Sequence, residues 1–157
     1  MKILRIIKFI FFLIIYFSLF NCGYQPLLNK ENQNFSIIKF NFEGNKRLGG
    51  LLKNNFISVK KEKNLLILNV KSLKKTTIAD KSQTGKTITY MLTVEFDVSA
   101  TDTSENIIFS KVYTKTRNYP ASDVHIDTLN NEKKLVEELI ESIANELQIE
   151  LNSIYQK

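Results

Sequence analysis

The strongest folding signal in the sequence is the stretch Thr87–Ala100, TITYMLTVEFDVSA. Apolar or aromatic side chains occupy every even position from Ile88 to Ala100, and mostly polar side chains occupy the odd positions. Neighbouring side chains of a β-strand point to opposite faces. This stretch therefore predicts a strand with one core face and one largely polar face.

Three other stretches rich in β-branched and aromatic residues predict further strands, at Phe35–Phe42, Leu65–Leu73 and Ile107–Tyr119. Polar turns are expected at Asp80–Gly85 and Thr101–Asn106, where residues that favour turns interrupt the apolar pattern. The last three strands are thus expected to follow one another as a meander.

Helical spacing of apolar residues predicts two helices. The first, Asn45–Phe56, is expected to be weak because the pair Gly49-Gly50 costs about 1 kcal/mol per residue relative to alanine. The second, Glu132–Ile154, carries a long apolar stripe that should pack on the sheet, and Asn130 or Asn131 could cap it.

The element order is therefore β-α-β-β-β-α, which predicts an α/β (α+β) fold. We expect a four-stranded mixed sheet whose first crossover is parallel, with two helices packed on one face. The chain has 157 residues, of which 43% are hydrophobic, and this length and composition suit a single domain.

The first 21 residues are expected to form a signal peptide rather than part of the fold. Lys2, Arg5 and Lys8 make a positive start, and Phe9–Phe20 is an uncharged apolar run of the length of a signal core. The run is short for a membrane span, which needs about 20 apolar residues, so an uncleaved anchor is the less favoured alternative. The predicted domain is residues 22–157.

Cys22 is the only cysteine, and it stands where the apolar run ends. A lone cysteine in an exported chain cannot form an internal disulfide. Leu19-Phe20-Asn21-Cys22 resembles a bacterial lipoprotein box, in which the cysteine becomes the acylated N-terminus, although Asn21 replaces the usual small residue. Cys22 is therefore the predicted lipidation site, and a buried structural cysteine is the alternative.

The charge balance does not favour a nucleic-acid partner. The formal net charge is +6, but removal of Lys2, Arg5 and Lys8 leaves 19 basic against 16 acidic residues. The remaining lysines alternate with acids instead of clustering with arginine and aromatic residues.

Signals of catalysis are weak, and we expect no enzyme activity, no metal and no cofactor. Gly85-Lys86-Thr87 resembles the end of a phosphate-binding loop, but Asp80 stands where the first glycine should be and a strand follows instead of a helix. A hairpin turn is the preferred reading. His125 is the only histidine. Carboxylates of the last helix are expected on its solvated side, at Glu137, Glu138, Glu141, Glu146 and Glu150.

The last predicted strand carries a mixture of basic and aromatic side chains on one face. Alternation places Lys111, Lys115 and Arg117 together with aromatic residues, namely Phe109, Tyr113 and Tyr119. Lysine and arginine attract phosphate groups, and aromatic side chains attract apolar groups. An ordinary half-exposed strand is the alternative, and a helix packed over this face would make Arg117 structural.

The sequence from Cys22 to Leu27, Cys-Gly-Tyr-Gln-Pro-Leu, resembles the mature N-terminus of the lipopolysaccharide-assembly lipoproteins, the LptE family. The similarity continues in order along the chain: a helix that begins near Arg47 and Leu51, the Arg117-Asn118-Tyr119 element, and an amphipathic C-terminal helix. Asn21 and Gly49-Gly50 depart from the family pattern.

The resemblance implies a lipid-anchored, periplasm-facing protein of the outer membrane. Members of the family plug the β-barrel translocon LptD, assist its assembly, and contact lipopolysaccharide on its way to the cell surface, without catalysing a reaction. The resemblance therefore makes four residues of the last strand the candidate lipopolysaccharide contacts: Lys111, Tyr113, Lys115 and Arg117. Two alternatives stay open. One is a generic lipoprotein that binds a peptide or scaffold partner, and the other is a small hydrolase that uses His125 with a carboxylate and a serine.

Overall fold

A computed structural model describes residues 33–56 and 62–156. The predicted signal peptide and Cys22 lie outside these residues. Six elements follow in the predicted order, and they are listed here in sequence: β1 (Ser36–Gly44), α2 (Lys46–Asn54), β2 (Leu65–Lys81), β3 (Thr87–Thr101), β4 (Ile107–Pro120) and α3 (His125–Ile154).

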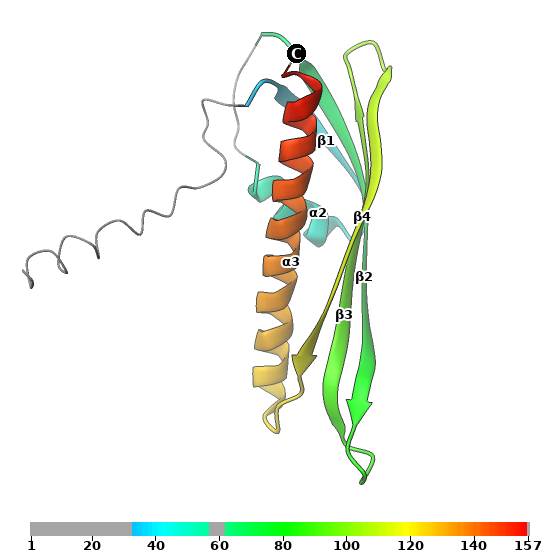
Figure 1. Ribbon diagram of the computed structural model, residues 1–157, viewed down its shortest axis with the longest axis vertical. Coiled ribbons are helices and arrows are strands. Elements are labelled where there is room, and N and C mark those ends of the chain that lie inside the picture. The colour runs from blue at the N-terminus through cyan, green and yellow to red at the C-terminus, as the bar shows by residue number, and fades with distance from the viewer. Residues whose placement is uncertain (1–32, 57–61, 157) are drawn as a thin grey trace, which may run out of the picture.

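The sheet has the order β1-β2-β3-β4. β1 pairs with β2 in parallel, and β2, β3 and β4 pair antiparallel. Both helices lie on the same side of this sheet (Figure 1). The four-stranded mixed sheet with a parallel first crossover and two helices on one face is therefore confirmed.

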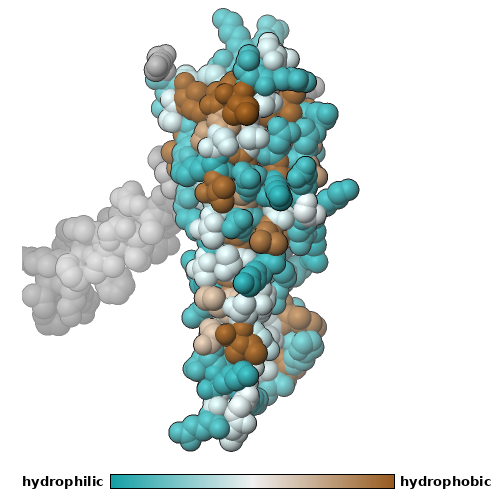
Figure 2. Space-filling model, turned by 90° about the vertical axis from the view of Figure 1, so that its right-hand side faces the viewer, coloured by the Kyte–Doolittle hydropathy of each residue, from teal (hydrophilic) through white to brown (hydrophobic). Residues whose placement is uncertain are grey.

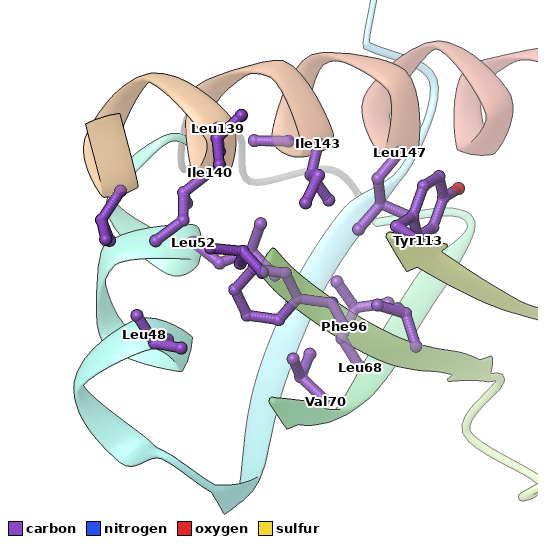
Figure 3. Close-up of a cluster of buried hydrophobic side chains, with 14 of the residues drawn as sticks. Leu48, Leu52, Leu68, Val70, Phe96, Tyr113, Leu139, Ile140, Ile143 and Leu147 are labelled. Carbon is purple, nitrogen blue, oxygen red and sulfur yellow. The ribbon is translucent and has the colours of Figure 1, made fainter. Parts of the chain in front are cut away.

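The core is formed between the sheet and the two helices. From Leu92 onward the even positions of β3 point into it, as the alternation predicted: Leu92, Val94, Phe96, Val98 and Ala100 are all fully buried, whereas Ile88 at the start of the same row is exposed. In Figure 3, the side chain of Phe96 reaches from the sheet toward Leu52 of α2, and Ile140 and Ile143 of α3 lie beyond Leu52. Burial of these apolar side chains is the main favourable contribution to folding.

The opposite face of the sheet is largely polar. Thr93 and Thr116 share a hydrogen bond of 3.0 Å between their hydroxyl groups, and Asn41 donates to the Oδ1 of Asn69 at 2.7 Å. Figure 2, which views the molecule from the sheet side, shows apolar side chains as separate patches among polar ones. This face lacks the wide apolar layer that a second covering element would require.

Two predicted boundaries are wrong. β2 continues to Lys81, eight residues past its predicted end at Leu73, because Lys74–Lys81 pair with β3 outside the core. α3 begins at His125 instead of Glu132, and neither Asn130 nor Asn131 caps it: the N-cap is Val124, which makes no side-chain hydrogen bond to the helix.

The turn between β2 and β3 contains the sequence that resembled a phosphate-binding loop. The backbone N–H of Ser82 donates to the carbonyl of Lys86 at 2.8 Å, and Gly85 has a φ of 82°. A glycine is favoured in this left-handed conformation. The preferred reading as a hairpin turn is confirmed.

The two glycines of α2 have different roles. A Cβ atom added at Gly49 would lie 2.4 Å from the ring of Phe42, whereas one added at Gly50 would meet nothing within 4 Å. Gly49 therefore lets α2 approach β1 closely. Gly50 allows no such contact and only destabilises the helix relative to alanine.

We expect Gly50→Ala to raise the free energy of unfolding by about 0.5–1 kcal/mol, because alanine favours the helix and finds open space. Gly49→Ala should lower it, since Phe42 must move. Chemical denaturation of both variants measures the difference. Equal effects of the two changes would contradict the distinct role given to Gly49.

Candidate functional site

The predicted basic and aromatic row of β4 faces α3. Tyr113 and Tyr119 are buried on this face. Lys115 is partly buried, and Lys111 and Arg117 are exposed. We call this contact the β4–α3 seam: Lys111, Tyr113, Lys115, Arg117 and Tyr119 on β4, and Glu132, Glu138, Glu146 and Glu150 on α3.

Each basic side chain of the row pairs with one carboxylate of α3. Lys111 donates to Glu150 at 2.5 Å, Lys115 pairs with Glu146, and Arg117 donates to Glu138 at 3.2 Å. Glu138 is exposed, as expected of the solvated side, whereas Glu146 and Glu150 are only partly exposed. These carboxylates connect the helix to the edge strand of the sheet.

The two tyrosines extend the same pattern. The hydroxyl of Tyr113 donates to Glu150 at 3.0 Å, and that of Tyr119 donates to Glu132 at 2.7 Å. Burial, reinforced by the hydrogen bond and charge of Glu150, raises the pKa of Tyr113. Burial and the hydrogen bond to Glu132 likewise raise the pKa of Tyr119. Both phenols stay protonated and act as donors.

Glu132, like Glu150, accepts hydrogen bonds from two side chains. It accepts from Lys74 of β2 at 2.5 Å as well as from Tyr119. Burial alone would raise the pKa of Glu132, but the hydrogen bonds from Lys74 and Tyr119 and the charge of Lys74 bring it below its ordinary value. A carboxyl group with a lowered pKa stabilises the fold above its unfolded-state pKa and loses this contribution as the pH falls.

The lengths of the two elements explain why the partners fall opposite one another. From Lys111 to Tyr119, β4 rises about 26 Å at 3.3 Å per residue. From Glu150 back to Glu132, α3 rises about 27 Å at 1.5 Å per residue. The two elements run in opposite directions, so the first basic residue of β4 meets the last carboxylate of α3.

The row remains partly open to solvent. The side chains of Lys111 and Arg117 are 47% and 59% exposed, and that of Lys115 is 31% exposed. An anionic ligand could reach them, but it would have to share or displace the carboxylates of α3. The structure therefore brings the candidate residues together and gives each of them a structural partner as well.

The charge-reversing pair Lys115→Glu and Arg117→Glu tests whether these basic residues stabilise the fold as well as being open to a ligand. Both new carboxylates would face Glu146 and Glu138, so two ion pairs become two repulsions. Exposed pairs contribute at most about 1 kcal/mol each, and we expect the free energy of unfolding to fall by about 1–2 kcal/mol at low salt and by less at high salt. Denaturant unfolding at two salt concentrations measures this.

Two sets of variants serve as controls for that prediction. Lys75→Glu with Lys81→Glu makes the same charge change at exposed lysines of β2 that form no ion pair in the described residues. Adding Glu138→Arg and Glu146→Lys to the charge-reversed seam should restore stability. An unchanged free energy of unfolding in the charge-reversed variant would show that these ion pairs do not stabilise the fold. Lipid binding should be measured on the same samples.

His125 lies in a hollow of about 410 Å³ beside the start of α3, together with Ser122 and Asp123. Within the described residues, no hydrogen bond joins these three side chains. Ser122 accepts from the backbone of Val124 at 3.2 Å, and Asp123 pairs with Lys86. A serine hydrolase arrangement requires the nucleophile and base within hydrogen-bond reach, which this geometry does not supply.

The described part of the chain also places no group of three histidine, cysteine, aspartate or glutamate side chains where they could hold a metal ion. Among residues 33–56 and 62–156, no helix has both the length and the apolar character needed to cross a bilayer.

Comparison with solved structures finds the same fold in bacterial lipoproteins. Rare lipoprotein B from Shewanella oneidensis matches with a TM-score of 0.55 and 14% sequence identity, over 73% of this chain and 94% of that one. Lipoprotein B from Nitrosomonas europaea matches with a TM-score of 0.58 and 15% identity, over 80% and 88%.

A minor lipoprotein from Acinetobacter baumannii has a TM-score of 0.54 and 15% identity, over 82% of this chain and 94% of that one. No family model and no curated protein matches the sequence. The domain thus has the fold of a group of bacterial lipoproteins and spans nearly their whole length, at a sequence identity that shows the fold alone.

Proposed function

We propose that this chain is a lipid-anchored interaction protein of the bacterial cell envelope. The observation that carries the proposal is the shared fold, which extends over most of this domain and nearly all of each lipoprotein neighbour. Cys22, directly after an apolar run, supplies the chemistry that an anchor needs. Several acyl chains, at about 0.8 kcal/mol per buried methylene, would keep the domain on a membrane.

We further propose that its role is that of the LptE family at the outer membrane. In this role it binds and plugs the β-barrel LptD, assists the assembly of the barrel, and helps to move lipopolysaccharide to the cell surface. Cys-Gly-Tyr-Gln-Pro-Leu at residues 22–27 supports this assignment. So do the positions of Arg47 in the first turn of α2 and of Arg117 and Tyr119 near the end of β4.

In this role the domain acts by shape and charge rather than by reaction. The β4–α3 seam connects α3 to the edge strand through ion pairs and tyrosine hydrogen bonds, which suits a plug. Lys111 and Arg117, half exposed at this edge, could contribute charge-assisted hydrogen bonds to lipopolysaccharide phosphates. Such contacts require no cofactor and no metal.

Purification of the full-length chain from native membranes in detergent tests the assignment. A large β-barrel protein should co-purify, and depletion of the chain should lower the amount of assembled barrel and admit bulky apolar toxicants into the cell. An unchanged barrel level with an intact permeability barrier would reject the LptD assignment. Co-purification of a different partner would favour the generic lipoprotein that serves as a scaffold.

A further inference from the structure

A second hollow lies between the two helices and borders the β4–α3 seam at Glu132. Its volume is about 340 Å³, and it is bounded by the first turns of α2, by Lys74 of β2 and by α3 from Leu129 to Glu137. We call it the α2–α3 hollow. Figure 1 shows α2 beside the middle of α3, on the helix side of the sheet.

One part of the α2–α3 hollow is apolar, and the rest of its lining is polar or charged. The apolar part is formed by four aliphatic side chains: Leu48, Leu51, Leu129 and Val136. Leu48 and Val136 belong to the buried core, whereas Leu129 is 46% exposed at the rim. Covering an exposed aliphatic side chain with an apolar group is favourable, because it removes apolar surface from water.

The rim of the hollow is basic. Arg47 and Lys133 both line it, and neither forms an ion pair within the described residues. The first turn of α2 contains Lys46 and Arg47 and no acidic residue. Glu137 is the one lining carboxylate without an ion pair there, since Glu132 is held by Lys74 and Tyr119. The lining therefore contains three basic against two acidic side chains, with two of the basic ones free.

We propose that the α2–α3 hollow binds a single-chain anionic amphiphile. Arg47 and Lys133 would hold its carboxylate or phosphate head, and the apolar chain would lie against Leu51, Leu129 and Val136. The volume is near the lower end of ligand pockets, about 300–1,000 Å³, and so suits one chain rather than a multiply acylated lipid. The proposal depends on the hollow alone and not on the LptD assignment.

Photolabelling of the full-length chain in native membranes tests the site. The probes are a diazirine-bearing fatty acid and a diazirine-bearing lysophosphatidic acid, and mass spectrometry locates the labelled peptides. We expect labels in residues 46–54 and 129–137. Arg47→Glu with Lys133→Glu should reduce labelling about tenfold, because the head group then loses two charge-assisted contacts.

The matched control is Lys46→Glu with Lys75→Glu, which makes the same charge change at exposed lysines that lie outside the lining and form no ion pair in the described residues. It should leave labelling unchanged. Leu129→Gln is a second test that does not disturb the core, since this side chain is half exposed, and it should weaken labelling without lowering the melting temperature.

Competition experiments distinguish an amphiphile from a free anion as the ligand. Unlabelled fatty acid should prevent labelling, and inorganic phosphate alone should not. Prevention by inorganic phosphate would mean a site for the free anion and would overturn the amphiphile. Equal labelling of the two double variants, or labels spread over the rest of the domain, would overturn the site itself.

Discussion

A chain in which Cys22 is replaced by alanine is expected to keep its signal peptide and to incorporate no lipid. The thiol is the only group at the end of the apolar run that can receive a diacylglycerol, and cleavage of a lipoprotein precursor follows this modification. The loss should be complete, because the sequence contains no second cysteine. Metabolic labelling with a radioactive fatty acid, together with the size of the chain on a gel, measures both results.

Asn21→Gly is the matched control for this prediction. It brings the residue before Cys22 closer to the family pattern and should keep or increase lipid incorporation. Incorporation that persists in the Cys22→Ala chain would reject Cys22 as the acylated residue, and absence of lipid from the unmodified chain would favour an uncleaved apolar segment.

Replacement of Phe96 by alanine is expected to produce the largest loss of stability from a single change in the core. Phe96 is fully buried on the central strand β3 and contributes to the cluster that joins the sheet to both helices (Figure 3). Truncation of a buried phenylalanine costs about 3–5 kcal/mol, because apolar contacts are lost and a cavity is left. Domains of this size have a total stability of about 5–15 kcal/mol.

Met91→Ala on the same strand is the control, since Met91 belongs to the outer face and is partly exposed. It should lower the free energy of unfolding by less than about 1 kcal/mol. Equilibrium unfolding in denaturant measures both variants. If Phe96→Ala lowered the free energy of unfolding as little as Met91→Ala, Phe96 would not face the core as described.

The sequence predicts the fold best where one face of an element is buried. The alternation of β3 is visible because its even positions meet the helices, and the same holds for the apolar stripe of α3 from Leu135 to Leu151. The signal is lost where an element leaves the core. Residues Lys74–Lys81 are exposed on nearly every side, and only their pairing with β3 makes them a strand.

The start of α3 was missed for the same reason. Its first ten residues contribute only Thr128 to the buried set, so no apolar stripe marks them. Hydrogen bonds between Ser122 and Thr128 fix the entry of the chain into the helix instead. Local contacts of this kind leave no periodic pattern in a sequence.

The sequence predicted the β4 residues of the candidate site but not their partners on α3. Alternation places Lys111, Lys115 and Arg117 on one face of β4, as the structure has them. Their carboxylate partners lie 21 to 39 residues later in the chain, so no local spacing rule connects them. The equal rise of β4 and α3 between the paired residues is the signal that could have found them, once both elements were known to run in opposite directions.

The extension of β2 beyond the core has a consequence for local motion. Its first half, from Leu65 to Ser72, places alternate side chains in the core, whereas from Thr77 onward it is held mainly by backbone hydrogen bonds to β3 (Figure 1). Segments with few buried apolar contacts open at a lower free energy than the whole domain. Amide protons near the hairpin should therefore exchange with solvent by fraying of the hairpin, and those of Leu66 and Leu68 only by global unfolding. We therefore expect one continuous strand to span two cooperative units, with its distal end opening while the rest of the domain stays folded.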